Sequence, residues 1–457
     1  MTSYFVDIGG NDGDSGLDWA NAWETVNKAA TTAVAGDDVT FGDGAYDCGA
    51  GQAAWNSGSA VGGYITFQAA NRRLAEWQST AGDPLITLTS ESYIKFIELS
   101  LKGELTTSWA HLYLTGSDHI IFDDCEIYNT SSRGICIRNA SDAITILDCD
   151  IHNDIGDSGA DVLDGIAIGE AGAVNTNILV DGCTIYHTPH SGILWGNVDG
   201  LIIQNCIVHD NDSHNVNSQG GDNIIIRDNI LYRAGFWDSP GWDDNRGIFI
   251  LGGANIEIYR NDIYENMGPG ISIDDTTPGP VEIYNNTLYD NDQNGVDWGD
   301  LFLHDNGGGQ DPVVVFKNNI IYHVAAGTDT IWIENAVWTN LDFDYNLYYD
   351  STGTEDIWVG AILYGTYAAY QTAGFEPNSV VSQDPTFTNA GAADFTLIVG
   401  SPAINEGTDV GLPYLDTDPD IGAHEYNPGG GGGSVVVVHI TVMLYTVNPV
   451  TVRSTCE

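Results

Sequence analysis

Residues 120–128 read Ile-Ile-Phe-Asp-Asp-Cys-Glu-Ile-Tyr, and the same frame recurs along the chain. With Cys125 as an anchor, apolar residues stand five and three places before it and two places after it, and an aromatic residue stands three places after it. The anchors are Cys125, Cys149, Cys183, Cys206, Asn229, Asn261, Asn286, Asn319 and Asn346, and the third residue after each is Tyr or His. Their spacings of 23 to 34 residues indicate a solenoid whose basic unit carries insertions.

The internal spacing of the frame predicts β-strands. Apolar residues before the anchor alternate with other residues, as in Ile144-Thr145-Ile146, which is the two-residue period of a half-buried strand. About nine residues after most anchors a second short strand opens with glycine, as in Gly134-Ile135-Cys136-Ile137. Brief strands joined by Gly, Asn and Asp corners predict an all-β parallel β-helix with coils ~4.8 Å apart.

From Tyr4 to Tyr426 the chain resembles the right-handed parallel β-helix proteins of the pectate-lyase-like superfamily. Tyr4-Phe5-Val6 and residues 16–23 resemble their N-terminal cap, in which a short helix covers the first coil. Residues 384–387 (Asp-Pro-Thr-Phe), 401–404 (Ser-Pro-Ala-Ile) and 420–426 (Asp-Ile-Gly-Ala-His-Glu-Tyr) resemble the closing coils. The resemblance implies a right-handed, single-stranded β-helix. It leaves the function open, because the superfamily includes lyases, hydrolases, epimerases, viral tailspikes and adhesins.

Five regions follow from these features. They are an N-terminal cap (1–35), parallel coils (36–350), closing coils with a C-terminal cap (351–427), a glycine-rich linker (428–434) and a β-strand tail (435–457). The tail is apolar and β-branched but shorter than the ~20 residues of a membrane helix, so we expect no membrane insertion. An unpaired strand of this kind is prone to associate. We therefore expect it to form a homo-oligomer or larger assembly, the alternative being a tail that folds back onto its own coils.

The composition restricts the partners. There are 64 acidic and 13 basic residues, giving a formal charge of −51. Nucleic acid is excluded as a partner because its binding depends on cationic side chains. The acidity suits a saline or cation-rich medium, or serves only to keep the surface solvated. The four cysteine anchors occupy one column, continued by five asparagines, so we expect them to be free thiols in an inward-facing ladder. Cys48 and Cys456 lie outside this column.

Two enlarged corners, after Cys149 and Asn229, predict a binding groove. Both insertions leave the same edge of the solenoid, three coils or about 14 Å apart, and the corners between them are rich in histidine. We expect this groove to bind a polysaccharide. The candidate catalytic residues are His190, His214, Arg233, Arg246 and Asp244, and the candidate substrate-binding residues are Asp157, Asp161, Asp164, His187, Trp237 and Trp242.

These residue types fit two reactions. Cleavage of an acidic polysaccharide by β-elimination needs a base such as His and a cation, Arg or Ca²⁺, that neutralises the uronate carboxylate. Hydrolysis needs two carboxylates about 5 to 9.5 Å apart. Tryptophan offers a flat face to sugar rings. His152 and His209 belong to the Tyr/His column of the frame, so we assign them to structural stacking.

The sequence alone does not decide whether a metal is bound or which biological role the protein has. Asn11, Asp12, Asp14 and Asp18, or Asp416, Asp418 and Asp420, could hold Ca²⁺, but neither set matches a full calcium loop. Three functions fit: an extracellular or virion-associated, spike-like protein that recognises and can depolymerise a surface polysaccharide; a secreted lyase acting on acidic glycans; or a non-catalytic filament, surface-layer or adhesin subunit.

Overall fold

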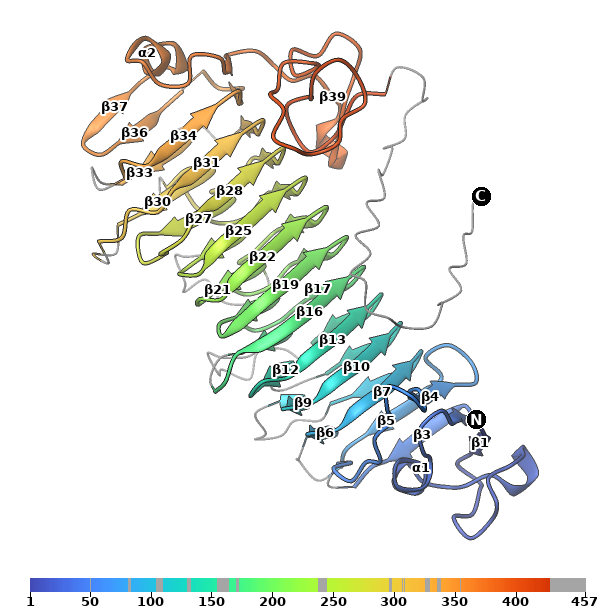
Figure 1. The fold of residues 1–457 in the computed structure, drawn as a ribbon. Helices are drawn as coiled ribbons and strands as arrows, with labels where there is room; N and C mark the ends of the chain where they lie inside the picture. The colour runs from blue at the N-terminus through green and yellow to red at the C-terminus, as the bar shows by residue number, and fades with distance from the viewer. Residues whose placement is uncertain are drawn as a thin grey trace.

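The chain winds through three long parallel sheets (Figure 1). The computed structural model describes residues 1–427 except 50, 81–83, 104–109, 130–132, 154–163, 170–171, 237–244, 296–297, 306, 308, 325–328, 335–337 and 354. Over these residues the protein is an all-β parallel solenoid with two short α-helices, α1 (Val26–Thr32) and α2 (Tyr367–Thr372). This confirms the predicted fold class. None of the helices in the described ranges is long and apolar enough to cross a membrane.

Most coils contribute one strand to each sheet. Sheet A contains β1 (Ser3–Val6), β2 (Asp38–Phe41), β4 (Ile65–Ala69), β7 (Ser92–Ile97), β10 (Asp118–Asp123), β13 (Asp142–Leu147), β16 (Asn175–Asp181), β19 (Val198–Gln204), β22 (Asp222–Arg227), β25 (Ala254–Tyr259), β28 (Val281–Tyr284), β31 (Val314–Lys317) and β34 (Leu341–Asp344). Sheet B contains β3 (Gly44–Asp47), β5 (Ala75–Gln78), β8 (Ser100–Lys102), β11 (Glu126–Tyr128), β14 (Asp150–His152), β17 (Thr184–Tyr186), β20 (Ile207–His209), β23 (Ile230–Tyr232), β26 (Asp262–Tyr264), β29 (Thr287–Tyr289), β32 (Ile320–His323), β35 (Leu347–Asp350) and β38 (Val380–Val381). Sheet C contains β6 (Ile86–Thr89), β9 (Ala110–Thr115), β12 (Arg133–Arg138), β15 (Ile166–Ile168), β18 (Ile193–Trp195), β21 (Val216–Ser218), β24 (Ile248–Ile250), β27 (Ile271–Asp274), β30 (Leu301–His304), β33 (Ile331–Ile333), β36 (Ile357–Val359) and β37 (Ile362–Tyr364). The first strand of sheet C is β6, and β37 pairs antiparallel with β36 at the other end of that sheet.

The core is a set of apolar columns that run along the solenoid. Ile120 of β10 pairs in parallel register with Ile144 of β13, which pairs with Ile178 of β16. All three side chains are buried. The alternation seen in the sequence therefore separates core residues from outward ones, and the stacking of like residues on like makes each coil a template for the next.

The corner between sheets A and B has a fixed conformation. The residue before each anchor adopts positive φ, as at Asp124 (52°), Asn205 (54°) and Gly182 (68°). Asp, Asn and Gly tolerate this region better than other residues. This explains why the corner is rich in these residue types.

The anchors form the predicted ladder. The Nδ2 atom of Asn229 donates to Oδ1 of Asn261 at 2.9 Å, and the same bond links Asn261 to Asn286, Asn286 to Asn319 and Asn319 to Asn346. The four cysteine anchors are buried free thiols, which confirms the interpretation of this column. Cys48 and Cys136 are likewise in no disulfide, and Cys456 lies outside the described residues.

A second polar ladder stands at the corner between sheets B and C. It was not predicted. Asn215 donates to Asn266, Asn266 to Asn291, and Asn291 to Oδ1 of Asp300, at 2.8 to 3.1 Å. All four side chains are buried. Their hydrogen bonds hold successive coils together where the chain enters sheet C.

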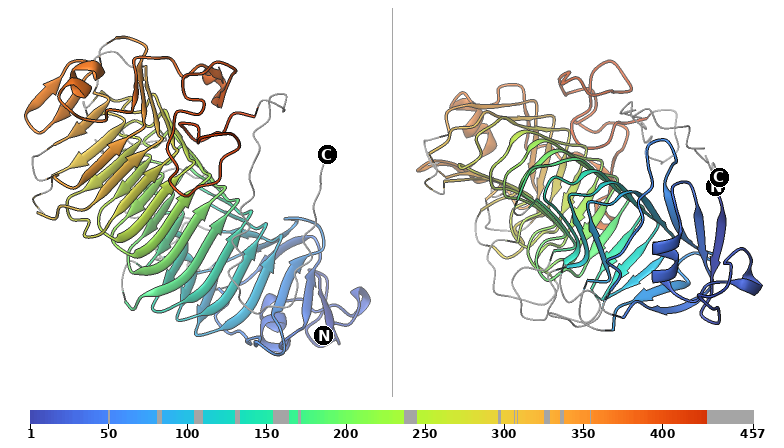
Figure 2. Two further views of the ribbon diagram at one scale, coloured as in Figure 1. Left: turned by 45° about the horizontal axis from the view of Figure 1, so that its top comes forward. Right: turned by 60° about the horizontal axis from the view of Figure 1, so that its bottom comes forward.

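The ends of the solenoid are covered. At the N-terminus α1 buries Val26, Ala29 and Ala30, and at the other end α2 buries Tyr367 and Tyr370. Residues 384–427, with β39 (Phe387–Asn389) and β40 (Asp394–Leu397), lie alongside sheet B (Figure 2). Their contacts include hydrogen bonds from His424 to Asp262 and from Asn318 to the carbonyl of Thr408. The segments that resemble closing coils thus pack beside sheet B, along its strands from β26 to β35.

Candidate functional site

The outer face of sheet C carries a line of aromatic and polar side chains. In the strands from β9 to β33 the residues on either side of the central one are buried, as Ile248 and Ile250 are around Phe249, so the central side chain points outward. In parallel register these outward residues are Tyr113, Cys136, Ala167, Leu194, Asn217, Phe249, Ser272, Phe302, Trp332 and Trp358.

A second column stands where the chain enters sheet C. The carbonyl groups of Asp164, Ser191, His214 and Arg246 accept backbone hydrogen bonds from Gly134, Gly165, Gly192 and Asn215 respectively. These four residues therefore occupy equivalent places on successive coils. Five consecutive coils present ionisable or hydroxyl side chains at one edge of the sheet, beginning with Arg133, which aligns with Asp164.

Asp164 is the centre of a buried polar group. Its side chain is 1% exposed, its Oδ1 lies 2.7 Å from Nδ1 of His190, and its Oδ2 lies 3.4 Å from Nε of Arg133. The backbone N–H of Ser191 also donates to Oδ1, at 3.3 Å. The Ser191 hydroxyl lies 3.2 Å from His190 Nδ1 and accepts from Asn217. The carboxylate thus fixes the orientation of the His190 ring.

His214 lies on the next coil. Its ring centroid is 6.3 Å from that of His190, and its Nδ1 accepts the backbone N–H of Arg246 at 3.2 Å. Burial, assisted by the charges of Arg246 and His190, lowers the pKa of His214 well below its ordinary value. Its imidazole is therefore neutral at neutral pH, and it is an acceptor within the site.

The guanidinium group of Arg246 lies on an aromatic platform. Its central carbon is 4.0 Å from the ring centroid of Phe249 and 5.4 Å from that of Trp298. Trp298 in turn stacks on Phe302 at 5.4 Å. Such contacts hold a guanidinium in a fixed plane, and Arg246 is buried, with 2% of its surface exposed.

The line continues toward the C-terminal end of sheet C. His304 contacts Phe302, and its Nδ1 lies 3.1 Å from Oδ2 of Asp274. The hydrogen bond to Asp274 raises the pKa of His304 above its ordinary value, and the charge of Glu334 acts in the same direction. From Arg133 on β12 to Glu334, which directly follows β33, the line crosses eight coils, or ~34 Å at one strand spacing per coil.

The structure brings four of the predicted site residues together: His190, His214, Arg246 and Asp164. It places two others apart from them. Arg233 lies over Phe236 and pairs with Asp210 at 2.8 Å. His187, with φ of 55°, contacts the edge of Tyr186 beside sheet B. Asp157, Asp161, Trp237, Trp242 and Asp244 lie outside the described residues.

The Tyr/His column has the stacking role that the sequence indicated. The rings of His152 and Tyr186 stack at 4.8 Å, and those of His209 and Tyr232 at 4.7 Å, on the outer side of sheet B. Further along, Phe395 covers Tyr264 and Tyr289. These two histidines therefore belong to the stacked wall of sheet B, whereas His190 and His214 lie where the chain enters sheet C.

The proposed calcium ligands are used within the fold. Asp12 accepts hydrogen bonds from the backbone of Glu24 and from Thr25, and Asp420 accepts from the backbone of Asn405 and Tyr426. In the part of the chain that the structure describes, no three His, Cys, Asp or Glu side chains come together as a metal site.

Several aromatic residues on the outer face of sheet C were not predicted from the sequence. Phe249, Phe302, Trp332 and Trp358 each stand between two aliphatic residues in the second strand of their coil. This pattern of an aromatic residue between two core residues was a signal that could have found them. No comparable sequence pattern marks Arg133 or Trp298.

Comparison with known proteins supports the fold. The family described as right handed beta helix region matches residues 110–235 and 164–328. Pectate lyase Pel9A is 18% identical, with a TM-score of 0.58 over 93% of this chain and 97% of that one. The A-module of the Azotobacter vinelandii mannuronan C-5 epimerase AlgE4 is 16% identical, with a TM-score of 0.52 over 76% and 91%. XylC in complex with xylose is 11% identical, with a TM-score of 0.54 over 85% and 87%. No curated protein matches the sequence.

Proposed function

Starting from the right-handed parallel β-helix fold, which the chain shares with a pectate lyase and a mannuronan epimerase, we propose that the protein acts on an acidic polysaccharide. The polymer lies along the outer face of sheet C. The observation that carries the proposal is the line of side chains from Arg133 to Glu334. It combines two arginines, three histidines and an aromatic cluster with the carboxylates of Asp164, Asp274 and Glu334. Cationic groups on this face offset the repulsion between a polyanion and a chain of formal charge −51.

The proposed reaction is β-elimination at a uronate residue. With Nδ1–H donating to Asp164, the neutral His190 ring carries its lone pair on Nε2. The C5–H bond breaks, the proton passes to His190, a C4=C5 double bond forms, and the C4–O bond to the next sugar breaks. The departing oxygen takes a proton from solvent.

Arg246 neutralises the substrate carboxylate in this scheme. Pairing with the guanidinium stabilises the charge that develops when C5 loses its proton. The platform of Phe249 and Trp298 places the guanidinium before substrate binds, so little conformational entropy is lost. His214 lies on the coil between His190 and Arg246 and accepts the Arg246 N–H.

We prefer elimination to hydrolysis because both carboxylate oxygens of Asp164 already have partners. Its two oxygens contact His190 and Arg133, so the carboxylate orients a base and is not available as the nucleophile or acid of a glycosidase pair. Non-catalytic recognition is the second candidate, and it uses the same face without the proton transfer.

We extend the proposal to location and assembly. A polysaccharide of this kind is encountered outside the cell, so the protein acts in the extracellular space or as a spike-like component of a virion, with a homo-oligomer formed through residues 435–457. That tail lies outside the described residues. Chains with and without residues 428–457 would be compared by light scattering. Equal molar mass for the two would overturn the assembly role.

The reaction is tested by following ultraviolet absorbance of unsaturated uronate and new reducing ends with pectate, alginate and other acidic glycans. We expect product from the wild type and loss of at least a hundredfold in rate for His190→Ala and Arg246→Ala. His119→Ala is the matched control, because His119 has similar exposure and its own aspartate, Asp118, on the outer side of sheet A. Binding without product would favour recognition, and absence of both would overturn the proposal.

A further inference from the structure

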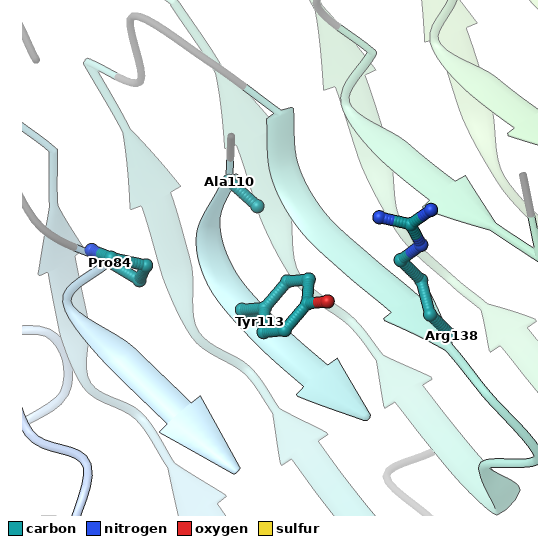
Figure 3. Close-up of a pocket in the computed structure, with 4 residues that line it drawn as sticks. All are labelled: Pro84, Ala110, Tyr113 and Arg138. Atoms are coloured by element: carbon teal, nitrogen blue, oxygen red, sulfur yellow. The ribbon is translucent and has the colours of Figure 1, made fainter. Parts of the chain in front are cut away.

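A separate pocket opens at the N-terminal end of the outer face of sheet C. It has a volume of about 300 Å³ and is lined by Pro84, Ala110, Tyr113 and Arg138. Figure 3 shows Tyr113 on the strand between Pro84 and Arg138, with its hydroxyl directed toward the side on which Arg138 lies. Three successive coils therefore contribute to one hollow.

The lining combines two kinds of surface. Pro84, Ala110 and the ring of Tyr113 offer apolar contact, and the Arg138 guanidinium offers N–H donors in a planar fork. A sugar ring has apolar C–H faces that pack on an aromatic ring, and a carboxylate is the anion that the arginine fork binds in two-point contact. A uronate residue carries both features.

The pocket is distinct from the site of the proposed reaction. Arg138 lies on β12 and Arg246 precedes β24, and β15, β18 and β21 stand between these strands. The two arginines are thus four coils apart along the solenoid axis, about 19 Å at one strand spacing per coil. They are also offset along the strand direction, because Arg246 aligns with Arg133 at the start of β12 and Arg138 ends that strand. The His190–Asp164 pair lies between them.

We propose that this pocket is a second carboxylate-binding subsite, which holds a uronate residue several sugars away from the one bound by Arg246. The inference rests on the proposed function and makes it more specific. The substrate is a polymer with closely repeated carboxylates, and chains too short to span both sites bind through Arg246 alone. Affinity therefore increases with chain length in a step, when the polymer first reaches Arg138.

The test uses the full-length chain with His190→Ala, so that the probe is not consumed, and titration calorimetry with trimers and octamers of galacturonate and of mannuronate. We expect Arg138→Ala to weaken octamer binding roughly 10- to 100-fold and to leave trimer binding unchanged. Arg138→Gln, which keeps side-chain bulk, gives the same result if the charge is responsible.

Arg72→Ala is the matched control. Arg72 contacts Asp124 at the opposite corner of the coil that contains Arg138, and its side chain is 60% exposed. It removes the same charge at a distance from the pocket, so octamer binding stays as in the parent. Equal octamer affinity with and without Arg138, or equal weakening of trimer and octamer, would overturn the subsite. Failure of the parent to bind any of the four probes would instead overturn the proposed function.

Discussion

The Nδ1 atom of His190 lies 2.7 Å from Oδ1 of Asp164, a carboxylate that is almost wholly buried in the outer face of sheet C. Arg133 and the backbone of Ser191 contact the same carboxylate. Three successive coils therefore determine the position of one histidine ring. A comparable pair, His119 and Asp118 at 3.2 Å, lies on the outer side of sheet A with a more exposed aspartate. The two pairs differ in surroundings more than in chemistry, so one serves as a control for the other.

Asp164→Asn should lower kcat for elimination roughly 10- to 100-fold with little change in KM, because the His190 ring loses its orienting partner while the carboxylate-binding groups remain. Initial rates over a range of substrate concentrations separate the two constants. Asp118→Asn makes the same exchange in the sheet A pair and should leave both constants unchanged. A kcat equal to the wild-type value in Asp164→Asn would contradict the role given to Asp164.

Arg246→Lys should raise KM about tenfold although the charge is kept. A lysine has no planar fork and stacks poorly on Phe249 and Trp298. Arg227 provides a control on the outer side of sheet A, since its guanidinium lies 6.0 Å from the Tyr259 ring and bonds to Gln204. Arg227→Lys should leave KM unchanged. If Arg246→Lys behaved as wild type, the aromatic platform would not position the cation for substrate.

Thermal stability should fall as the pH rises from about 4.5 to about 7. Glu376 ends the asparagine ladder, where it accepts from Asn346, Ser379, Tyr348 and Tyr370. Burial raises its pKa to about 7 from an ordinary value of 4.5, against the opposing effect of these hydrogen bonds. The folded chain thus keeps a proton that the unfolded chain releases, and the stabilisation, up to roughly 3 kcal/mol, is lost through that range.

Glu376→Gln should flatten this dependence, measured as the difference in melting temperature between pH 5 and pH 8. Glu355→Gln changes a less buried carboxylate on a neighbouring coil and should retain the wild-type slope. The same slope in Glu376→Gln and wild type would show that other groups carry the dependence. Asp292 and Glu425, whose pKa values burial also raises to about 7, are the first alternatives.

Salt should stabilise the protein. With a formal charge of −51, repulsion between surface carboxylates opposes folding, and the screening length falls from ~10 Å at 0.1 M to ~3 Å at 1 M. We expect a higher melting temperature in 1 M than in 0.1 M sodium chloride. A melting temperature that is unchanged or lower would indicate that local ion pairs, such as those of Arg73 with Asp124 and Asp150, outweigh the repulsion.

The sequence predicted the coils well because every coil repeats the same core positions, so that Ile120, Ile144 and Ile178 support one interpretation together. The site was predicted less fully for a physical reason. The corner before each second strand has a different length, and Phe249 and Phe302 cannot be aligned without knowing how each corner closes. The second ladder, from Asn215 to Asp300, escaped notice for the same reason. The packing of Phe395 on Tyr264 depends on a tertiary contact that no local pattern encodes.

The anchor column changes from cysteine to asparagine between Cys206 and Asn229. Asn229 accepts the N–H of Cys206 and donates to Asn261 and to the carbonyl of Ile203. The Cys206 thiol already lies 3.7 Å from the equivalent carbonyl, that of Val180. In Cys206→Asn a new amide would therefore find acceptors at Val180 and Asn229, in a space of nearly the same volume. We expect its melting temperature to equal or exceed that of the wild type.

Asn229→Cys should instead destabilise the protein by about 1–3 kcal/mol, because the buried Cys206 N–H and Ile203 carbonyl lose their partner. Melting curves of both variants under reducing conditions measure the difference. Equal destabilisation by the two exchanges would show that side-chain size, and not the hydrogen-bonded chain of amides, determines which residues the column accepts.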